Sequence, residues 1–233
     1  MRLLAIETAT TRTAVALGDD SSVAEEVPDA QGRHTEVLAP TVVALLSARG
    51  WSPQDLDGVV VDVGPGLFTG LRVGIATAKG LAVATGVGLF SVSSADVLAQ
   101  TACDAGATGL VAAVVDARRR EVFWALYDVT SDGFEEIVAV TVCEPSVLAR
   151  RLDELGGPVT LVGDGAHAHR DTLGHPGRLM LDDVQVPSAA SALRLVRSRI
   201  ESGATAFAHH DVHPWYVREA DAVANFQIRG PVA

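Results

Sequence analysis

The first half of the chain alternates short apolar segments with longer amphipathic ones. The predicted strands, which are short, apolar and bounded by turn residues, cover residues 3–7, 13–17, 23–27, 59–63 and 88–92. The predicted helices, in which apolar side chains recur three and four residues apart, cover residues 35–49, 69–85 and 94–103. Strands that alternate with helices indicate an α/β fold.

After a turn-rich segment at residues 104–109, the same order of elements recurs. The second set of predicted strands covers residues 110–116, 121–127, 135–142 and 159–163, and the second set of helices covers 145–155 and 188–201. Two copies of a βββαβα unit predict a duplicated architecture. We therefore expect a first lobe at residues 1–104, a second lobe at 109–203 and a C-terminal tail at 204–233.

The segment between residues 58 and 94 is a strand, a loop and a helix. Its loop, Gly64-Pro65-Gly66, could free backbone N–H groups to bind phosphate beside the start of a helix. The phosphate loop of the Walker type needs Lys followed by Ser or Thr after its last glycine, and Leu67 and Phe68 stand there instead. The spacing of a dinucleotide-binding loop is also absent.

Small residues form two lines along the helix that follows this loop. Gly70, Gly74, Ala78 and Ala82 recur every four residues, and so do Ala76, Gly80 and Ala84. Each glycine inside a helix costs about 1 kcal/mol relative to alanine, so these positions indicate close approach of another backbone. That backbone belongs either to this chain, as tight packing of helix on sheet, or to a partner.

The composition is that of an acidic globular protein. The 233 residues carry a formal net charge of −11, with 48% hydrophobic and 20% charged residues. A protein that binds nucleic acid by itself normally presents a basic face, so a role with RNA would run through a partner. Two cysteines, Cys103 and Cys143, do not make a disulfide framework or a zinc site. No uncharged apolar run is long enough to span a membrane, and we expect a cytoplasmic protein.

Several ordered motifs resemble the bacterial TsaB (YeaZ) family. The clearest is the run from Gly64 to Gly74, GPGLFTGLRVG, together with the opening segment LAIETAT at residues 4–10. Weaker matches are VDAR at residues 115–118, EVFW at 121–124 and PWYVR at 214–218. Proteins of this family take part in making threonylcarbamoyladenosine next to the anticodon of tRNA. The resemblance implies a two-lobed actin-like ATPase (ASKHA, ribonuclease H-like) fold, in agreement with the duplicated βββαβα pattern.

Proteins with this fold clasp ATP between the lobes, where the turn after each first strand carries an acid and a glycine. Here the first turn keeps Glu7 and Thr8 and the second keeps Asp116, but neither has the glycine. Gly163 and Gly165 resemble a third nucleotide loop, although such a pair also suits a simple strand-to-helix turn. We expect a vestigial nucleotide cleft. Glu7 and Asp116 are either a metal-holding pair or strand-end acids bonded to turn amides, and the missing glycines favour the second interpretation.

No catalytic residue and no metal ligand is predicted. The related transferase TsaD carries a His-x-Glu-x-His metal motif after its Gly-Pro-Gly loop, and that motif aligns with Ser94, Asp96 and Leu98, which leaves no pair of histidines. His167 and His169 alternate in a way that suits a metal only with further ligands nearby. A hydrolase triad has no support, because no serine lies in a nucleophile-elbow pattern.

The resemblance implies a non-catalytic scaffold that pairs with TsaD, with TsaE binding the pair and tRNA contacted only indirectly. It implies that the two helices of the first lobe form the partner surface, and we expect a homodimer through the same face without TsaD. The residues expected to make these contacts line the helix faces and are Leu38, Val42, Leu45, Gly70, Gly74, Ala78 and Ala82. No cofactor is expected in this chain, and ATP or ADP with Mg²⁺ would bind in the complex.

Two alternatives from other classes remain open at this point. The first is an active actin-like ATPase or small-molecule kinase that uses Glu7, Asp116 and the loop at Gly163. The second is a peptidase, which would require a nucleophile or metal site. Nucleotide binding with Mg²⁺ by the isolated chain would favour the first alternative.

Overall fold

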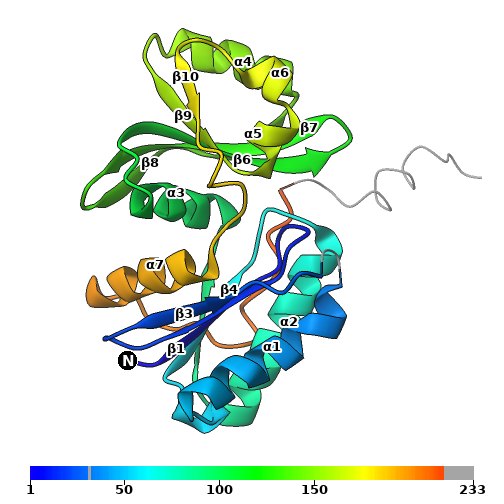
Figure 1. The fold of residues 1–233 in the computed structure, drawn as a ribbon, viewed down its shortest axis with the longest axis vertical. Coiled ribbons are helices and arrows are strands. Elements are labelled where there is room, and N and C mark those ends of the chain that lie inside the picture. Colours follow the sequence, from blue (N-terminus) through cyan, green and yellow to red (C-terminus); the bar gives the residue numbers. More distant parts are fainter. Residues whose placement is uncertain (31–32, 218–233) are drawn as a thin grey trace, which may run out of the picture.

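The computed structural model describes residues 1–30 and 33–217 and arranges them in two lobes, one above the other in Figure 1. The strands are β1 (Leu3–Glu7), β2 (Ala14–Gly18), β3 (Val23–Glu26), β4 (Gly58–Asp62), β5 (Gly88–Val92), β6 (Gly109–Arg118), β7 (Glu121–Thr130), β8 (Gly133–Cys143), β9 (Val159–Val162) and β10 (Arg178–Met180). The helices are α1 (His34–Arg49), the single turn η1 (Pro53–Asp55), α2 (Phe68–Thr85), α3 (Ser94–Asp104), α4 (Pro145–Glu154), α5 (Asp164–Ala168), α6 (Arg170–Leu173) and α7 (Ala189–Glu201).

The two sheets have the same strand order. The first runs β3-β2-β1-β4-β5 and the second β8-β7-β6-β9-β10. In each sheet the three strands that come first in the chain, β1 to β3 or β6 to β8, pair antiparallel with their neighbours in sequence. The next strand in the chain, β4 or β9, pairs in parallel with β1 or β6. Equal order and direction confirm the predicted duplicated α/β architecture.

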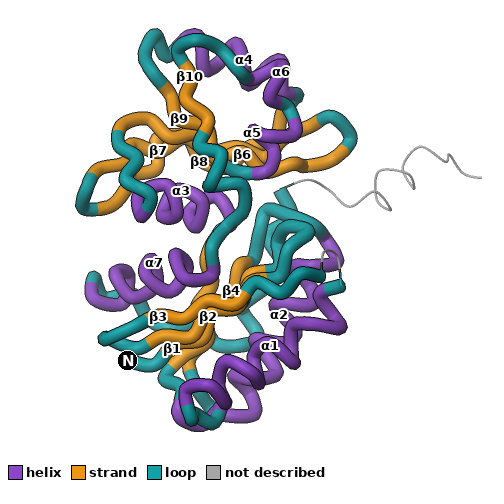
Figure 2. Tube along the Cα trace, viewed as in Figure 1, coloured by secondary structure: helices purple, strands orange, loops and turns teal. Residues whose placement is uncertain are grey.

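The first sheet is covered on both faces, as the tube in Figure 2 shows. Leu4 and Ile6 of β1 point toward α1 and α2, whereas Leu3 and Ala5 point toward α7. Because both faces of β1 are buried, its sequence is apolar throughout instead of alternating.

Helices α3 and α7 are exchanged between the lobes. Helix α3 precedes the second sheet in sequence and packs on that sheet, while α7 follows the second sheet and packs back on the first. The two helices also contact each other in the middle of the molecule, where Arg194 and Ser191 of α7 bind Asp104 of α3. The linker expected at residues 104–109 therefore separates the two sheets. Helix α3 precedes this linker in the chain but packs on the second sheet.

Three elements were not predicted, namely α5, α6 and β10, which span five, four and three residues. Segments this short do not complete enough turns or alternations to show a period. The part of the expected tail that is described, residues 204–217, runs along the first lobe: Phe207 N–H donates to Leu89 O at 2.8 Å and Trp215 N–H to Val63 O at 2.7 Å. Residues 218–233 lie outside the described part. No described helix combines the length and apolarity needed to cross a bilayer.

Candidate functional site

The outer face of α1 and α2 is a surface of small apolar residues. On α2 an exposed line runs through Phe68, Arg72, Ala76, Gly80 and Ala84, with the side chain of Val83 beside it 62% exposed. Residues four apart are neighbours on successive turns of a helix, so these positions form a continuous line along α2. This line faces solvent because the opposite side of α2 packs on the first sheet.

The outer side of α1 continues this surface. Its exposed residues include Ala39, Pro40, Val43 and Ala44, and the side chain of Val43 is 62% exposed. Helices α1 and α2 lie side by side on the same face of the sheet, so their exposed sides form one surface (Figure 1). We call the exposed residues of α1 and α2 named here the helix face.

The structure corrects the residues expected at the partner surface. Leu38, Val42, Leu45, Ala78 and Ala82 are all buried in the core between the two helices and the first sheet. Their side chains therefore stabilise the lobe itself and are not accessible to a partner. The apolar line that the periodicity detects is the inward side of each helix.

Gly70 and Gly74 also face inward. A Cβ atom at Gly70 would overlap the carbonyl oxygen of Thr8, and one at Gly74 would overlap the hydroxyl oxygen of Thr8. Close approach of α2 to the end of β1 is therefore the reason for these two glycines. Gly80, on the other line, has open space around its position, so the second line of small residues is the exposed one.

At the start of α2, Tyr216 of the tail joins Phe68 and Arg72 of the helix face in an aromatic and cationic cluster. The rings of Phe68 and Tyr216 stack with centroids 5.5 Å apart. The guanidinium carbon of Arg72 lies 3.5 Å from the centroid of the Phe68 ring, and its Nε–H donates to Tyr216 Oη at 3.0 Å. Tyr216 thus holds the described part of the tail against the start of α2, and no local pattern in the sequence identified Phe68 and Arg72 as its contacts.

The residues expected in the first half of the nucleotide cleft are bonded inside the first lobe. The Thr8 hydroxyl donates to Gly70 O at 2.8 Å, and Glu7 Oε1 accepts from Ala9 N–H at 2.7 Å. The small pocket beside Glu7, which Thr10 and Arg12 also line, has a volume of about 150 Å³. Small-molecule sites usually measure about 300–1,000 Å³, so this pocket is smaller than a usual ligand site.

The second half of the expected cleft is also occupied by internal contacts. Asp116 accepts from the backbone N–H and the guanidinium of Arg118, each at 2.8 Å. A Cβ at Gly163 would overlap the carbonyl oxygen of Val114, and one at Gly165 would overlap the carbonyl carbon of the next residue, Val115. These glycines therefore allow the turn after β9 to pack on β6.

Asp164 links the second-lobe cleft residues to one another, since its Oδ1 accepts from Asp116 N–H at 2.9 Å. Burial raises the pKa of the Asp164 carboxyl above its usual value. The structure thus brings Asp116, Gly163 and Gly165 together near the carboxyl ends of the neighbouring strands β6 and β9. Among the residues described, no hydrogen bond or ion pair joins this group to Glu7.

The positions that align with the metal motif of TsaD hold structural residues. Ser94 Oγ donates to Asp62 Oδ1 at 2.8 Å, Asp96 accepts from the Tyr127 hydroxyl at 2.9 Å, and Leu98 is fully buried. Within residues 1–30 and 33–217, no three His, Cys, Asp or Glu side chains converge in a way that could hold a metal ion.

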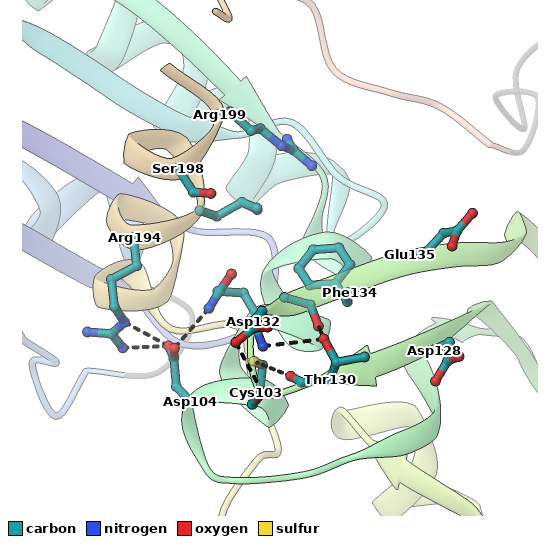
Figure 3. A pocket seen from close by; sticks show the side chains of 14 residues that line it. Cys103, Asp104, Asp128, Thr130, Asp132, Phe134, Glu135, Arg194, Ser198 and Arg199 are labelled. Carbon is teal, nitrogen blue, oxygen red and sulfur yellow. Dashed lines mark hydrogen bonds and ion pairs between the residues drawn. The ribbon is translucent and has the colours of Figure 1, made fainter. Parts of the chain in front are cut away.

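A larger groove lies between α3, α7 and the β7–β8 hairpin (Figure 3). Its volume is about 690 Å³, and its lining includes Asp104, Arg194 and Cys103. Asp104 Oδ2 accepts from both Nε–H and Nη2–H of Arg194, at 2.8 and 2.6 Å. The Cys103 thiol donates to Thr130 O at 3.3 Å, and burial raises its pKa, so it is a weak nucleophile.

The fold and the cleft define a class, a two-lobed protein of actin-like ATPase fold. Residues 27–192 match the family model described as "TsaD: tRNA N6-adenosine threonylcarbamoyltransferase". In Escherichia coli (strain K12), the tRNA threonylcarbamoyladenosine biosynthesis protein TsaB is 35% identical over 94% of this chain and 95% of its own length. The protein of the same name from Bacillus subtilis (strain 168) is 29% identical, over 97% of this chain and 98% of its own.

A solved structure agrees with these sequence relatives. The protein described as having similarity to peptidase YEAZ, from Pseudomonas aeruginosa, superposes with a TM-score of 0.83 at 28% identity, over 93% of this chain and 99% of its own. The chain belongs to the TsaB family.

Proposed function

We propose that this chain is a non-catalytic subunit in the biosynthesis of tRNA threonylcarbamoyladenosine, and that it pairs through the helix face with a transferase of the TsaD type. The observation that carries this proposal is an exposed, small and apolar surface on a lobe whose expected nucleotide positions are closed. Membership of the TsaB family supports the pathway.

The composition of the helix face supports pairing with another helical surface. Ala39, Ala44, Ala76, Gly80 and Ala84 carry side chains of one carbon or none, so a partner helix can approach the backbone closely. The aromatic and cationic cluster at Phe68, Arg72 and Tyr216 then provides anchoring residues at one end, of the types that contribute most to binding in interfaces.

The contacts inside the cleft support a role without catalysis in this chain. An ATPase needs backbone N–H groups open to phosphate, whereas the turn after β1 here is packed under α2 by the Thr8 and Gly70 contact. We therefore expect any ATP or ADP with Mg²⁺ to bind in the complex, with TsaE as a further partner and tRNA held by the transferase.

The test is size-exclusion chromatography with light scattering on this chain alone and with the TsaD-type transferase of the same organism. The expected result is a one-to-one complex, and a homodimer through the same face when the transferase is absent. Val43→Asp places a charge on the helix face and should abolish the complex.

Leu179→Asp is the matched control, because Leu179 lies on β10 of the other lobe and is 61% exposed, almost the same as Val43. Both variants should keep the wild-type circular dichroism spectrum. A complex that forms equally well with both variants would contradict the proposed face. Saturable binding of ATP with Mg²⁺ by the chain alone would instead favour an active ATPase or kinase.

A further inference from the structure

Two neighbouring strands of the first sheet end in buried carboxyl groups. The parallel register pairs Ile6 of β1 with Val61 of β4, so the next residues, Glu7 and Asp62, stand side by side. Their side chains follow Ala5 and Val60 onto the face of the sheet that turns toward α7 and the other lobe. Glu7 is 2% exposed and Asp62 is 1% exposed, so neither carboxyl is solvated.

Each carboxyl group has one satisfied oxygen and one unsatisfied oxygen. Glu7 Oε1 accepts from Ala9 N–H at 2.7 Å, and Asp62 Oδ1 accepts from Gly64 N–H at 2.7 Å and from Ser94 Oγ–H at 2.8 Å. Among the described residues, no N–H or other O–H group donates to Glu7 Oε2 or Asp62 Oδ2, and both atoms are buried. Two buried carboxylates with unsatisfied oxygens would repel each other strongly.

The surrounding charges do not relieve this repulsion. Two acids on other elements act on the pair, Glu25 of β3 on Glu7 and Asp96 of α3 on Asp62, and Asp96 is itself paired with Arg199 of α7 at 2.7 Å. Asp183 and the exposed Arg12 line the small pocket beside Glu7, and in the described part of the chain no ion pair joins a cation to either carboxyl. A single proton between the two unsatisfied oxygens would satisfy both of them and remove one negative charge.

We propose that Glu7 and Asp62 share one proton, which Glu7 carries and donates through Oε2–H to Oδ2 of an ionised Asp62. The proton belongs on Glu7 because Asp62 already accepts two hydrogen bonds that stabilise its negative charge, while Glu7 accepts one. Burial, and next the negative charge of Asp62, raise the pKa of Glu7 well above its usual value.

This acid pair joins the ends of β1 and β4, with the turns that follow them, to the start of α3. Asp62 holds the Gly64 loop and Ser94, the first residue of the exchanged helix α3, while Glu7 holds the turn after β1 at Ala9. The sequence alone left Glu7, at this end of the first strand, open as half of a metal-holding pair. In this chain the same position holds a proton, so the pair stabilises the joint between the lobes and does not bind a cation.

The pH dependence of stability has a definite sign. A carboxyl whose pKa is raised in the folded state binds more protons there than in the unfolded chain. Stability from the pair is therefore complete below the usual glutamate pKa of about 4.3 and falls as pH rises from there toward the raised value. Within that window the midpoint of thermal unfolding, Tm, should fall by about 3–5 °C for each pH unit.

Glu7→Gln tests the proposal, because an amide N–H replaces the shared proton at every pH. The Tm difference between Glu7→Gln and the wild type should be smallest at or below about pH 4 and grow as pH rises. Glu26→Gln is the matched control, since Glu26 lies on β3 of the same sheet with an exposed carboxyl, and it should show the wild-type pH dependence. The side-chain carboxyl ¹³C resonance of Glu7 should titrate at a higher pH than that of an ordinary glutamate such as Glu26.

Three results would overturn the shared proton. The first is a Tm for Glu7→Gln that follows the wild type at every pH, and the second is a Glu7 resonance that titrates at the usual glutamate pKa. The third is a rise of the wild-type Tm with Mg²⁺ that Glu7→Gln lacks, which would assign the pair to a cation. None of these measurements needs the partner, so they are independent of the proposed pairing.

Discussion

Leucine substitutions at Gly74 and Gly80 of α2 distinguish the line of small residues that packs on the first sheet from the line that is exposed. In Gly74→Leu the new side chain would overlap the Thr8 hydroxyl, which donates to Gly70 O at 2.8 Å. Overpacking and the lost hydrogen bond together should cost about 3 kcal/mol or more. For a chain of this size that lowers Tm by about 6–12 °C.

Gly80→Leu should have the opposite effect on stability. The position is exposed with open space around it, and replacing glycine by leucine inside a helix gains almost 1 kcal/mol of helix propensity. Its Tm should rise by about 2–4 °C. On the helix face, however, the added side chain would keep a partner helix away, and overpacking of about 1–3 kcal/mol weakens pairing roughly 5- to 150-fold.

The assay combines thermal unfolding with light scattering over a series of concentrations, with and without the transferase. Gly157→Leu is the control, since Gly157 is exposed with equally open space and lies between α4 and β9 of the second lobe. Wild-type pairing by Gly80→Leu would refute the helix face as the interface. A wild-type Tm for Gly74→Leu would refute the internal packing role of the line that contains Gly70 and Gly74.

Three further outcomes are expected from contacts elsewhere in the chain. Tyr216→Ala removes the stacking on Phe68 and the bond to Arg72, so limited proteolysis should cleave residues 204–217 faster while Tm changes by under about 2 °C. Gly163→Ala combines a positive φ of 100° with overlap on β6 and should cost about 2–4 kcal/mol in denaturant unfolding. Asp164→Asn keeps an acceptor for Asp116 N–H but cannot ionise, so its stability should fall less than that of the wild type as pH rises above about 4.

The order of elements was predictable because most of them are long enough to show a period. Helix α1 was expected from residue 35 and begins at His34, and β5 has the expected bounds. The exchange of α3 and α7 was not predictable from the chain. Both helices have an apolar side that suits either sheet, and only the three-dimensional path of the chain decides which sheet each one covers.

The candidate site shows a similar limit. The sequence contains two lines of small residues on α2 with the same spacing, and nothing local tells which one faces the sheet. The structure resolves this through Thr8, whose carbonyl and hydroxyl oxygens lie against Gly70 and Gly74. Asp62 was missed for another reason: it ends a valine strand as an ordinary turn acid would, and its pairing with Glu7 depends on the register of β1 with β4.

The duplicated architecture places the two acids that the sequence assigned to a nucleotide cleft in equivalent positions of the two lobes. Near the end of the first strand of each lobe, an acid is bonded to its own turn and lies beside a second acid. Glu7 accepts from Ala9 N–H and stands next to Asp62 in the register of β1 with β4. Asp116 accepts from Arg118 N–H and donates its own backbone N–H to Asp164. In each lobe glycines bring neighbouring segments against that turn. On the proposed scaffold role, the contacts of Thr8 with Gly70 and Gly74 serve to hold α2 on the first sheet and so support the helix face from inside.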